Sequence, residues 1–172
     1  MSGQLRTSRR SFFGILVGSI SAIVGALMAI PLARFALHPL FHPGGGADWY
    51  PLGASEDFSG TDPVRAEVEV RKLDGWRASV VKQSVWVTRS AQGQLTVLSA
   101  VCPHLGCVVP WSAEQKMFAC PCHKGFFSRD GTRLGGPPPR GLDPLLSKVE
   151  DGKVWVKYQY FRQLVAGREV IG

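Results

Sequence analysis

Two short segments of the chain contain most of its metal-binding residue types. All four cysteines and two of the four histidines fall within residues 102–123, in the sequences Cys102-Pro-His104-Leu-Gly-Cys107 and Cys120-Pro-Cys122-His123. Four cysteines alone allow three disulfide pairings. Histidines at C-x-H and C-x-x-H spacing instead indicate metal binding, because thiolate and imidazole are common ligands of zinc and iron. Each segment offers one thiolate, one imidazole and one further cysteine.

A cluster of two irons and two sulfides, with two cysteines on one iron and two histidines on the other, needs this set of ligands. The spacing C-x-H-x15-C-x2-H resembles that of the Rieske iron–sulfur protein of cytochrome bc-type complexes. The resemblance implies one [2Fe-2S] cluster whose buried iron is bound by Cys102 and Cys120. By the same resemblance, His104 and His123 bind the outer iron.

The same resemblance implies a disulfide between Cys107 and Cys122, which would tie the two ligand loops together. Such a bond is chemically reasonable outside the cytoplasm. The sequence Gly136-Pro137-Pro138-Pro139 is similar to the family's proline loop, which covers the far side of the cluster. A structural zinc site is an alternative, because both spacings also suit zinc, although zinc would not explain the two additional cysteines.

The chain departs from the family pattern at two positions near the second ligand segment. High-potential members carry a serine and a tyrosine where this chain has Gly125 and Phe127, and neither residue donates a hydrogen bond from its side chain. A hydrogen bond to a charged group is worth about 1.5–3 kcal/mol, so each loss is expected to lower the potential by about 60–130 mV. Restoring either hydroxyl should raise it. Lys124 acts in the opposite direction, and a one-residue shift would place Ser128 in the donating position.

The rest of the chain beyond Trp49 has the pattern of an all-β domain. Val64, Ala66, Val68 and Val70 alternate with polar residues, which predicts a half-buried strand. Further strands are expected at Val80–Thr88, Leu95–Val101, Val108–Trp111, Lys116–Ala119, around Val149 and at Val154–Tyr160. The 20 glycines and 12 prolines argue against a helical bundle. By resemblance we expect a Rieske-type antiparallel sandwich over residues 49–172, with a cluster-binding subdomain at about 100–143.

The N-terminal part has the pattern of a membrane anchor. The 22 residues from Phe12 to Ala33 carry no charge, and as a helix they would rise about 33 Å, enough for a bilayer core. We expect one transmembrane helix over residues 12–37. A cleaved secretory signal is the alternative, but its apolar region is normally only about 7–15 residues long. Of the net charge of +7, four arginines fall in residues 1–34, which contain no acid. The charge therefore indicates a membrane segment, and we expect no nucleic-acid partner.

The segment before this helix predicts export of the protein, and the segment after it predicts a flexible tether. Ser8-Arg9-Arg10-Ser11-Phe12-Phe13 resembles a bacterial twin-arginine export signal, which assigns residues 1–11 to the cytoplasm. The alternative is an arginine pair that follows the positive-inside rule. Residues 38–48 contain two prolines and three consecutive glycines, so we expect a flexible tether with no helix. The remaining domain would lie on the periplasmic side of the bacterial inner membrane.

The resemblance implies the Rieske subunit of a bacterial quinol–cytochrome c oxidoreductase, anchored in membrane lipid. With a cytochrome b subunit it would oxidise quinol and pass the electron to a c-type cytochrome, and the predicted low potential favours a low-potential quinol such as menaquinol. His123 is then the residue that meets the quinol, His104 remains exposed, and Leu105 is an apolar cover at the docking tip. The small Rieske subunit of a periplasmic molybdenum oxidase, such as arsenite oxidase, is the alternative.

Overall fold

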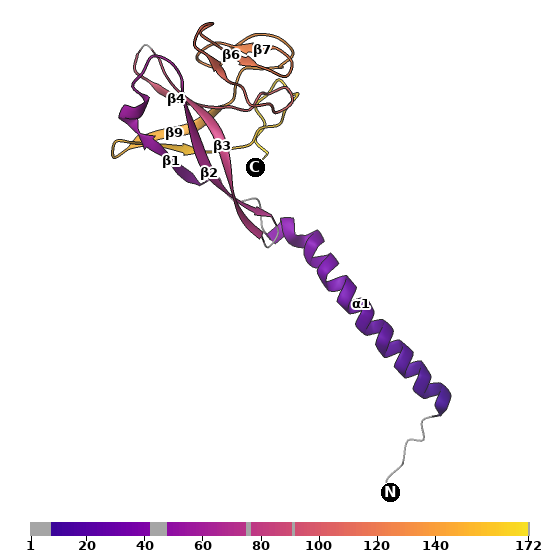
Figure 1. Ribbon diagram of the computed structural model, residues 1–172. Helices are drawn as coiled ribbons and strands as arrows, with labels where there is room; N and C mark the ends of the chain where they lie inside the picture. The colour runs from indigo at the N-terminus through magenta and orange to yellow at the C-terminus, as the bar shows by residue number, and fades with distance from the viewer. Residues whose placement is uncertain (1–7, 42–47, 75–76, 91, 172) are drawn as a thin grey trace. The chain divides into compact units, whose positions relative to one another are not determined.

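The computed structural model describes residues 8–41, 48–74, 77–90 and 92–171 (Figure 1). It contains two compact units, residues 1–44 and residues 45–172. The first is one helix, α1 (Arg9–Phe41), whose first turn is capped by the Ser8 hydroxyl, which accepts the N–H of Ser11 at 3.2 Å. An 18-residue stretch within Arg9–His38 has a mean hydropathy of 2.3, and the segment is long and apolar enough to cross a membrane.

The helix extends further than the sequence predicts. It continues through Pro39 to Phe41, although residues 38–41 were expected to belong to a tether without helix. A proline removes one backbone hydrogen bond of its turn, and the bonds of the neighbouring residues maintain the helix. The rest of the expected tether up to Ala47, including the three glycines, lies outside the described residues.

The second unit is built on an antiparallel sheet of six strands that nearly closes into a barrel. The strands are β1 (Trp49–Ala54), β2 (Val64–Asp74), β3 (Arg77–Arg89), β4 (Leu95–Ser99), β9 (Pro144–Glu150) and β10 (Lys153–Lys157). Their order is β1-β10-β9-β4-β3-β2. The two edge strands, β1 and β2, approach each other, so the sheet curls rather than stacking flat. The predicted all-β fold with an apolar N-terminal helix is therefore confirmed.

A smaller sheet is inserted between two neighbouring strands of the larger one. Its strands, in the order β5-β6-β7-β8, are β5 (Trp111–Ser112), β6 (Met117–Cys120), β7 (Gly125–Phe127) and β8 (Arg133–Gly135). β4 pairs directly with β9, where Val97 lies opposite Leu145, so the chain leaves and re-enters the large sheet at one place. Figure 1 shows β6 and β7 beyond the end of β4. Both cysteine segments belong to this insertion.

Two hydrophobic cores match the two sheets. The first fills the near-barrel with side chains such as Val68, Val85 and Val154, all fully buried. The second lies under the insertion and contains Phe118 and Phe127. A short 3₁₀ helix, η1 (Ser55–Phe58), contributes Phe58 to the first core. Alternation of apolar residues along the strands produces the first core, because one face of each strand turns inward.

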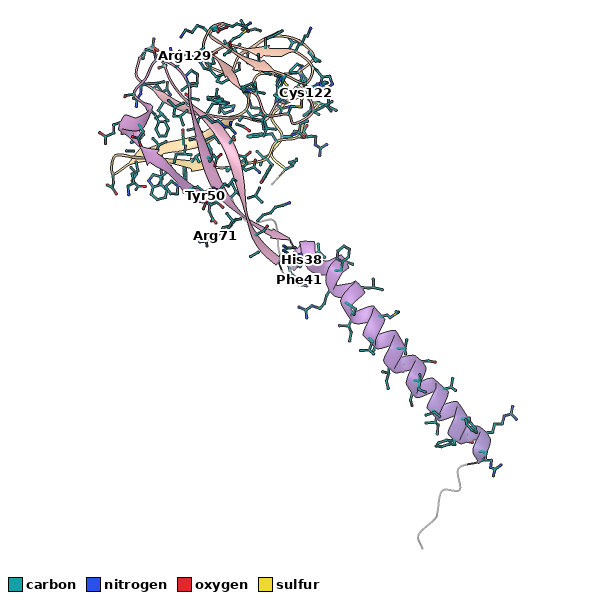
Figure 2. The ribbon with its side chains drawn as sticks, viewed as in Figure 1. His38, Phe41, Tyr50, Arg71, Cys122 and Arg129 are labelled. Carbon is teal, nitrogen blue, oxygen red and sulfur yellow. A yellow bond between two sulfur atoms is a disulfide. The ribbon has the colours of Figure 1, made fainter. Side chains whose placement is uncertain are left out.

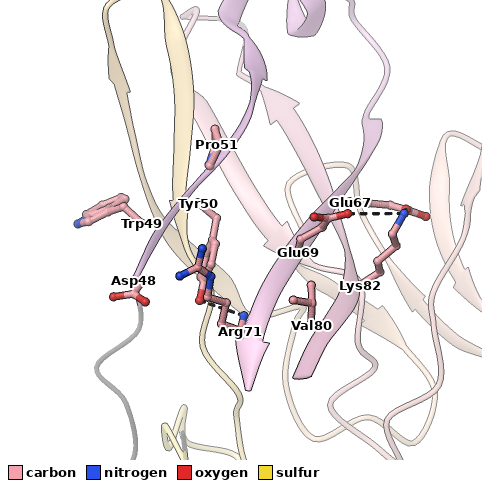
Figure 3. A pocket seen from close by; sticks show the side chains of 9 residues that line it. All are labelled: Asp48, Trp49, Tyr50, Pro51, Glu67, Glu69, Arg71, Val80 and Lys82. Carbon is pink, nitrogen blue, oxygen red and sulfur yellow. Dashed lines mark hydrogen bonds and ion pairs between the residues drawn. The ribbon is translucent and has the colours of Figure 1, made fainter. Parts of the chain in front are cut away.

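The seam between β1 and β2 contains an open depression (Figure 3). The Tyr50 hydroxyl accepts the backbone N–H of Arg71 at 3.3 Å across this seam. Exposed Lys82 forms an ion pair with Glu69 at 3.7 Å on the same face. No residue that lines the depression belongs to the cysteine and histidine segments.

Three strands differ from the sequence-based expectations. β1 was not predicted because Pro51 and Gly53 interrupt any alternation, and it is held by pairing with β10. β7 and β8 are three residues long each, too short for a periodic pattern. Val108, expected in a strand, makes an isolated bridge to Val101.

Candidate metal centre

The first ligand loop, residues 102–107, is closed by its own backbone. The N–H of Cys102 donates to the carbonyl of Cys107 at 2.8 Å, and the N–H of Gly106 donates to the carbonyl of Cys102 at 3.0 Å. Gly106 has a φ of +78°, which glycine adopts without strain. The bridge between Val101 and Val108 joins the two ends of the loop. The loop therefore brings both of its cysteines to one end and leaves His104 near the turn.

The second ligand loop, residues 120–125, joins β6 to β7. Cys120 pairs with Gly125 across the hairpin, and the four residues between them form the turn. Lys124 has a φ of +54°, a left-handed conformation in a residue other than glycine. Such conformations are costly and persist where the surroundings hold them. The turn leaves Cys122 and His123 exposed, while Cys120 is buried at the strand end.

The four cysteines form two chemically different pairs. Cys107 and Cys122 are joined in a disulfide with their Cα atoms 6.6 Å apart, as the family resemblance implies (Figure 2). Cys102 and Cys120 are free thiols that are 1% and 4% exposed. Burial, with a smaller contribution from Cys120, raises the pKa of the Cys102 thiol to about 11. A metal that binds there displaces this proton, since the thiolate is the ligand.

The sulfur atoms of Cys107, Cys120 and Cys122 all lie within 4.8 Å of one another. Their proximity does not make them a metal site, because the two disulfide-bonded sulfurs have no thiolate to offer. Cys120 is the free thiol of the three, and it lies beside the other free thiol, Cys102.

The two histidines lie together on the outer side of the loops. The ring centroids of His104 and His123 are 4.9 Å apart, and the rings are nearly perpendicular. His123 is exposed and His104 is half-buried. The expectation that His104 remains exposed therefore needs correction, because the residue is half-buried. The set contains two buried thiols and two adjacent imidazoles at the surface, which fits a [2Fe-2S] cluster with unlike ligands on its two irons.

The proline loop is packed directly on the second ligand loop. A Cβ at Gly125 would lie 2.5 Å from Cγ of Pro138, and a Cβ at Gly136 would lie 2.3 Å from the carbonyl oxygen of Lys124. Both distances are shorter than real Cβ contacts, so a side chain at either position would force its neighbour to shift. The prediction that Gly125→Ser adds a hydrogen-bond donor stays a prediction, and this contact adds that Pro138 must shift to make room for the serine.

The surroundings of Phe127 and Ser128 bear on the predicted low potential. Phe127 is fully buried in the same core as both free cysteines. The single proton of the Ser128 hydroxyl is shared between the Asp130 carboxylate and the carbonyl of Thr132, so it is engaged within its own turn. The hydrogen bond from Ser128 holds the pKa of Asp130 below its usual value. Ser128 therefore does not replace the missing donors.

A buried tryptophan that supports the first ligand loop was not found from the sequence. The indole N–H of Trp86, on β3, donates to the carbonyl of Val109 at 2.8 Å. Its ring also contacts Phe118 of β6, with centroids 5.3 Å apart. Trp86 appears in the sequence as one residue of an apolar run, and nothing in that pattern indicates which distant carbonyl it meets.

The two loops present two buried thiols, two surface imidazoles and a connecting disulfide. They lie on a small sheet that is inserted in a larger one. This combination defines a Rieske-type iron–sulfur domain. The protein-family model described as Rieske [2Fe-2S] domain matches residues 48–147, and the chain belongs to this family. It is 34% identical over 155 residues to the menaquinol:cytochrome c reductase iron-sulfur subunit of Geobacillus thermodenitrificans, covering 88% of this chain and 91% of that protein.

Two further relatives extend the comparison. The subunit of the same name from Bacillus subtilis (strain 168) is 32% identical over 160 residues, covering 91% of this chain and 95% of the relative. The cytochrome b6-f complex iron-sulfur subunit of Chlorobaculum tepidum is 31% identical over 148 residues, covering 86% of this chain and 74% of the relative. The similarity to these membrane-complex subunits thus extends over most of the chain, beyond the cluster-binding segments.

Proposed function

We propose that the chain is the Rieske subunit of a bacterial quinol–cytochrome c oxidoreductase and that its quinol is menaquinol. The observation that carries the proposal is the exposed His123 ring beside His104, on loops whose two free thiols are buried. Two relatives that match nearly their whole length are named as menaquinol:cytochrome c reductase subunits.

In this proposal Cys102 and Cys120 hold one iron of the cluster, and His104 and His123 hold the other. The donor types support the assignment, because buried thiolates and surface imidazoles separate into two pairs. When bound, the cluster supplies one-electron redox chemistry. The disulfide between the loops keeps the two pairs together.

His123 is the residue that meets the quinol. Its ring is exposed, so the nitrogen that does not bind iron is available to a quinol hydroxyl. That nitrogen would accept the quinol proton, and the cluster, when bound, would supply the one-electron acceptor. Leu105, which is 55% exposed next to His104, provides apolar surface for docking.

The environment of the site suits a low-potential quinol. Phe127 offers no hydroxyl, and Gly125, which lies against Pro138, has no side chain. Fewer hydrogen bonds to the sulfur atoms leave the reduced, more negative cluster less stabilised. A cluster held in these surroundings would be suited to accept electrons from a low-potential quinol such as menaquinol.

The proposed partners are a cytochrome b subunit, a c-type cytochrome, the quinol and membrane lipid. Helix α1 is the anchor in the bacterial inner membrane, and the β unit lies on the periplasmic side. Arg9 and Arg10 precede the apolar run, as a twin-arginine export signal requires. The part of the predicted tether that follows Phe41 remains the proposed hinge.

The proposal is tested on the full-length protein purified from the membranes of its host. We expect co-purification of b-type and c-type haem, and menaquinol-dependent reduction of cytochrome c. Leu105→Glu should lower this turnover without changing the cluster's absorbance. Val149→Glu, at a comparably exposed position on β9, is the matched control. Zinc without acid-labile sulfide, or co-purification with a molybdenum subunit, would replace the proposal with one of its alternatives.

The hinge is tested separately. Replacement of Gly44, Gly45 and Gly46 by proline should slow turnover while the cluster content stays the same, because the stiffened segment restricts travel between the two partners. Unchanged turnover would show that the movement occurs elsewhere.

A further inference from the structure

The C-terminal segment that follows β10 contacts the first ligand loop directly. We propose that residues 161–170, called here the strap, position the Cys102–Cys107 loop, and that Arg140 holds the strap in place. Neither the strap nor Arg140 belongs to the cysteine and histidine segments. The inference depends on the Rieske centre and not on the identity of the quinol.

The strap is a closed element with its own hydrogen bonds. Phe161 and Val170 form an antiparallel bridge, and the N–H of Arg162 donates to the carbonyl of Glu169 at 2.9 Å. The side chains of Arg162 and Glu169 form an ion pair at 3.2 Å. Phe161 is buried in the barrel core, so one end of the strap is fixed to the large sheet.

The tip of the strap reaches the ligand loop. The N–H of Leu164 donates to the carbonyl of Pro103 at 2.9 Å, and Pro103 lies between Cys102 and His104. Leu164 has a φ of +62°, a left-handed conformation that leucine rarely adopts. Since Leu164 is exposed, core packing of its side chain does not account for this conformation. The hydrogen bond to Pro103 and the anchoring of the neighbouring carbonyls account for it.

Arg140 supplies that anchoring. It is 7% exposed and forms two hydrogen bonds of 2.8 Å with the Asp143 carboxylate. Its remaining donors reach the strap, at the carbonyl of Val165 (2.6 Å) and the carbonyl of Arg162 (2.9 Å). These two carbonyls flank Leu164 on either side. A buried guanidinium with a fixed fork of donors can hold both at once, whereas a lysine cannot.

Arg140 also joins the strap to the other ligand loop. It follows the proline loop immediately, and Pro138 of that loop lies against Gly125 at the end of the second ligand loop. The first ligand loop is therefore tied at Cys107 by the disulfide and at Pro103 by the strap. His104 lies between these two attachments, so the strap helps to fix the orientation of the His104 ring.

The test compares Arg140→Lys with the double variant Arg140→Met/Asp143→Leu in the full-length protein. The lysine variant retains a charge but loses the fork. The double variant removes both charges, which avoids leaving one buried and unpaired, and it still removes the donors to the strap. In both, hydrogen exchange at Leu164 and in the Cys102–Cys107 loop should accelerate about tenfold, as expected for loss of a hydrogen bond to a charged group. The EPR spectrum of the reduced cluster should broaden, and its midpoint potential should shift.

Val68→Ala is the matched control, because Val68 is fully buried in the barrel core, away from the insertion. It should lower the thermal midpoint of unfolding without changing the EPR spectrum or the potential. The proposal would be overturned if the folded double variant had the hydrogen-exchange rates and the EPR spectrum of the wild type. It would also be overturned if Val68→Ala changed these two quantities as much as the Arg140 variants do. Leu164→Gly, which keeps the N–H and relieves the left-handed conformation, should retain the wild-type spectrum.

Discussion

Alanine at position 125 is predicted to loosen the second ligand loop. Gly125 is buried at the start of β7, and a Cβ there would lie 2.5 Å from Cγ and 3.0 Å from Cδ of Pro138. Carbon atoms in favourable contact lie about 3.5–4.0 Å apart, so the added methyl group overlaps the proline ring by about 1 Å. Overpacking of this kind costs about 1–3 kcal/mol. We expect Gly125→Ala to lower the free energy of unfolding by that amount and to release the cluster faster.

The contact with Pro138 is isolated by a double-mutant cycle. Pro138→Ala removes Cγ and Cδ, so the combination Gly125→Ala/Pro138→Ala should cost clearly less than the two single changes added together. Stability is measured by thermal unfolding of the full-length protein, and cluster release by the decay of visible absorbance. Gly135→Ala is the matched control, since nothing lies within 4 Å of a Cβ at that position. Additive costs, or a Gly125→Ala variant as stable as Gly135→Ala, would refute the steric explanation.

Three further outcomes are expected. Phe127→Tyr places a hydroxyl in the core that contains both free cysteines, and it should raise the midpoint potential by about 60–130 mV in a redox titration. An unchanged midpoint potential would mean that the hydroxyl donates no hydrogen bond to a sulfur atom. Cys107→Ser and Cys122→Ser should lower cluster retention and potential, and two titratable thiols in the unreduced, cluster-containing wild type would contradict the disulfide. Burial raises the pKa of Tyr158 from 10.0 to about 12, so the folded protein binds this proton more tightly than the unfolded chain does. Its contribution to stability is full below pH 10.0 and is lost as the pH rises to about 12. The free energy of unfolding should therefore fall with pH over this range, and it should fall less steeply in Tyr158→Phe.

The side chains that the structure brings together as candidate ligands could be predicted from the sequence, because few side chains bind iron and they are concentrated in two short segments. Cys102 and His104 are two residues apart, and Cys120 and His123 are three apart, so local spacing carries most of the information. The all-β class was predictable for the same reason. Alternation along Val64–Val70 shows which residues face inward, independently of the strand's partner.

Contacts between separate segments could not be predicted in this way. Gly125 was interpreted as a missing donor, and its contact with Pro138, which lies in another loop, was not predicted. The hydrogen bond from Arg140 to the carbonyl of Val165 joins residues 25 positions apart, and no periodic pattern in the sequence indicates it. β1 forms through pairing with β10, at the other end of the domain. In each case the partner is decided by tertiary packing.

The unequal exposure of the four cysteines has a consequence for the biogenesis of the protein. With the proposed ligands, iron and sulfide would have to reach Cys102 and Cys120 before the loops close over them, because both thiols are almost fully buried in the finished fold. Cys122 lies at the surface, so an oxidant can still reach it after folding and close the bond to Cys107. Maturation can therefore proceed in two compartments, with metal insertion in a reducing one and thiol oxidation later in an oxidising one, without any need to unfold the domain between the two steps.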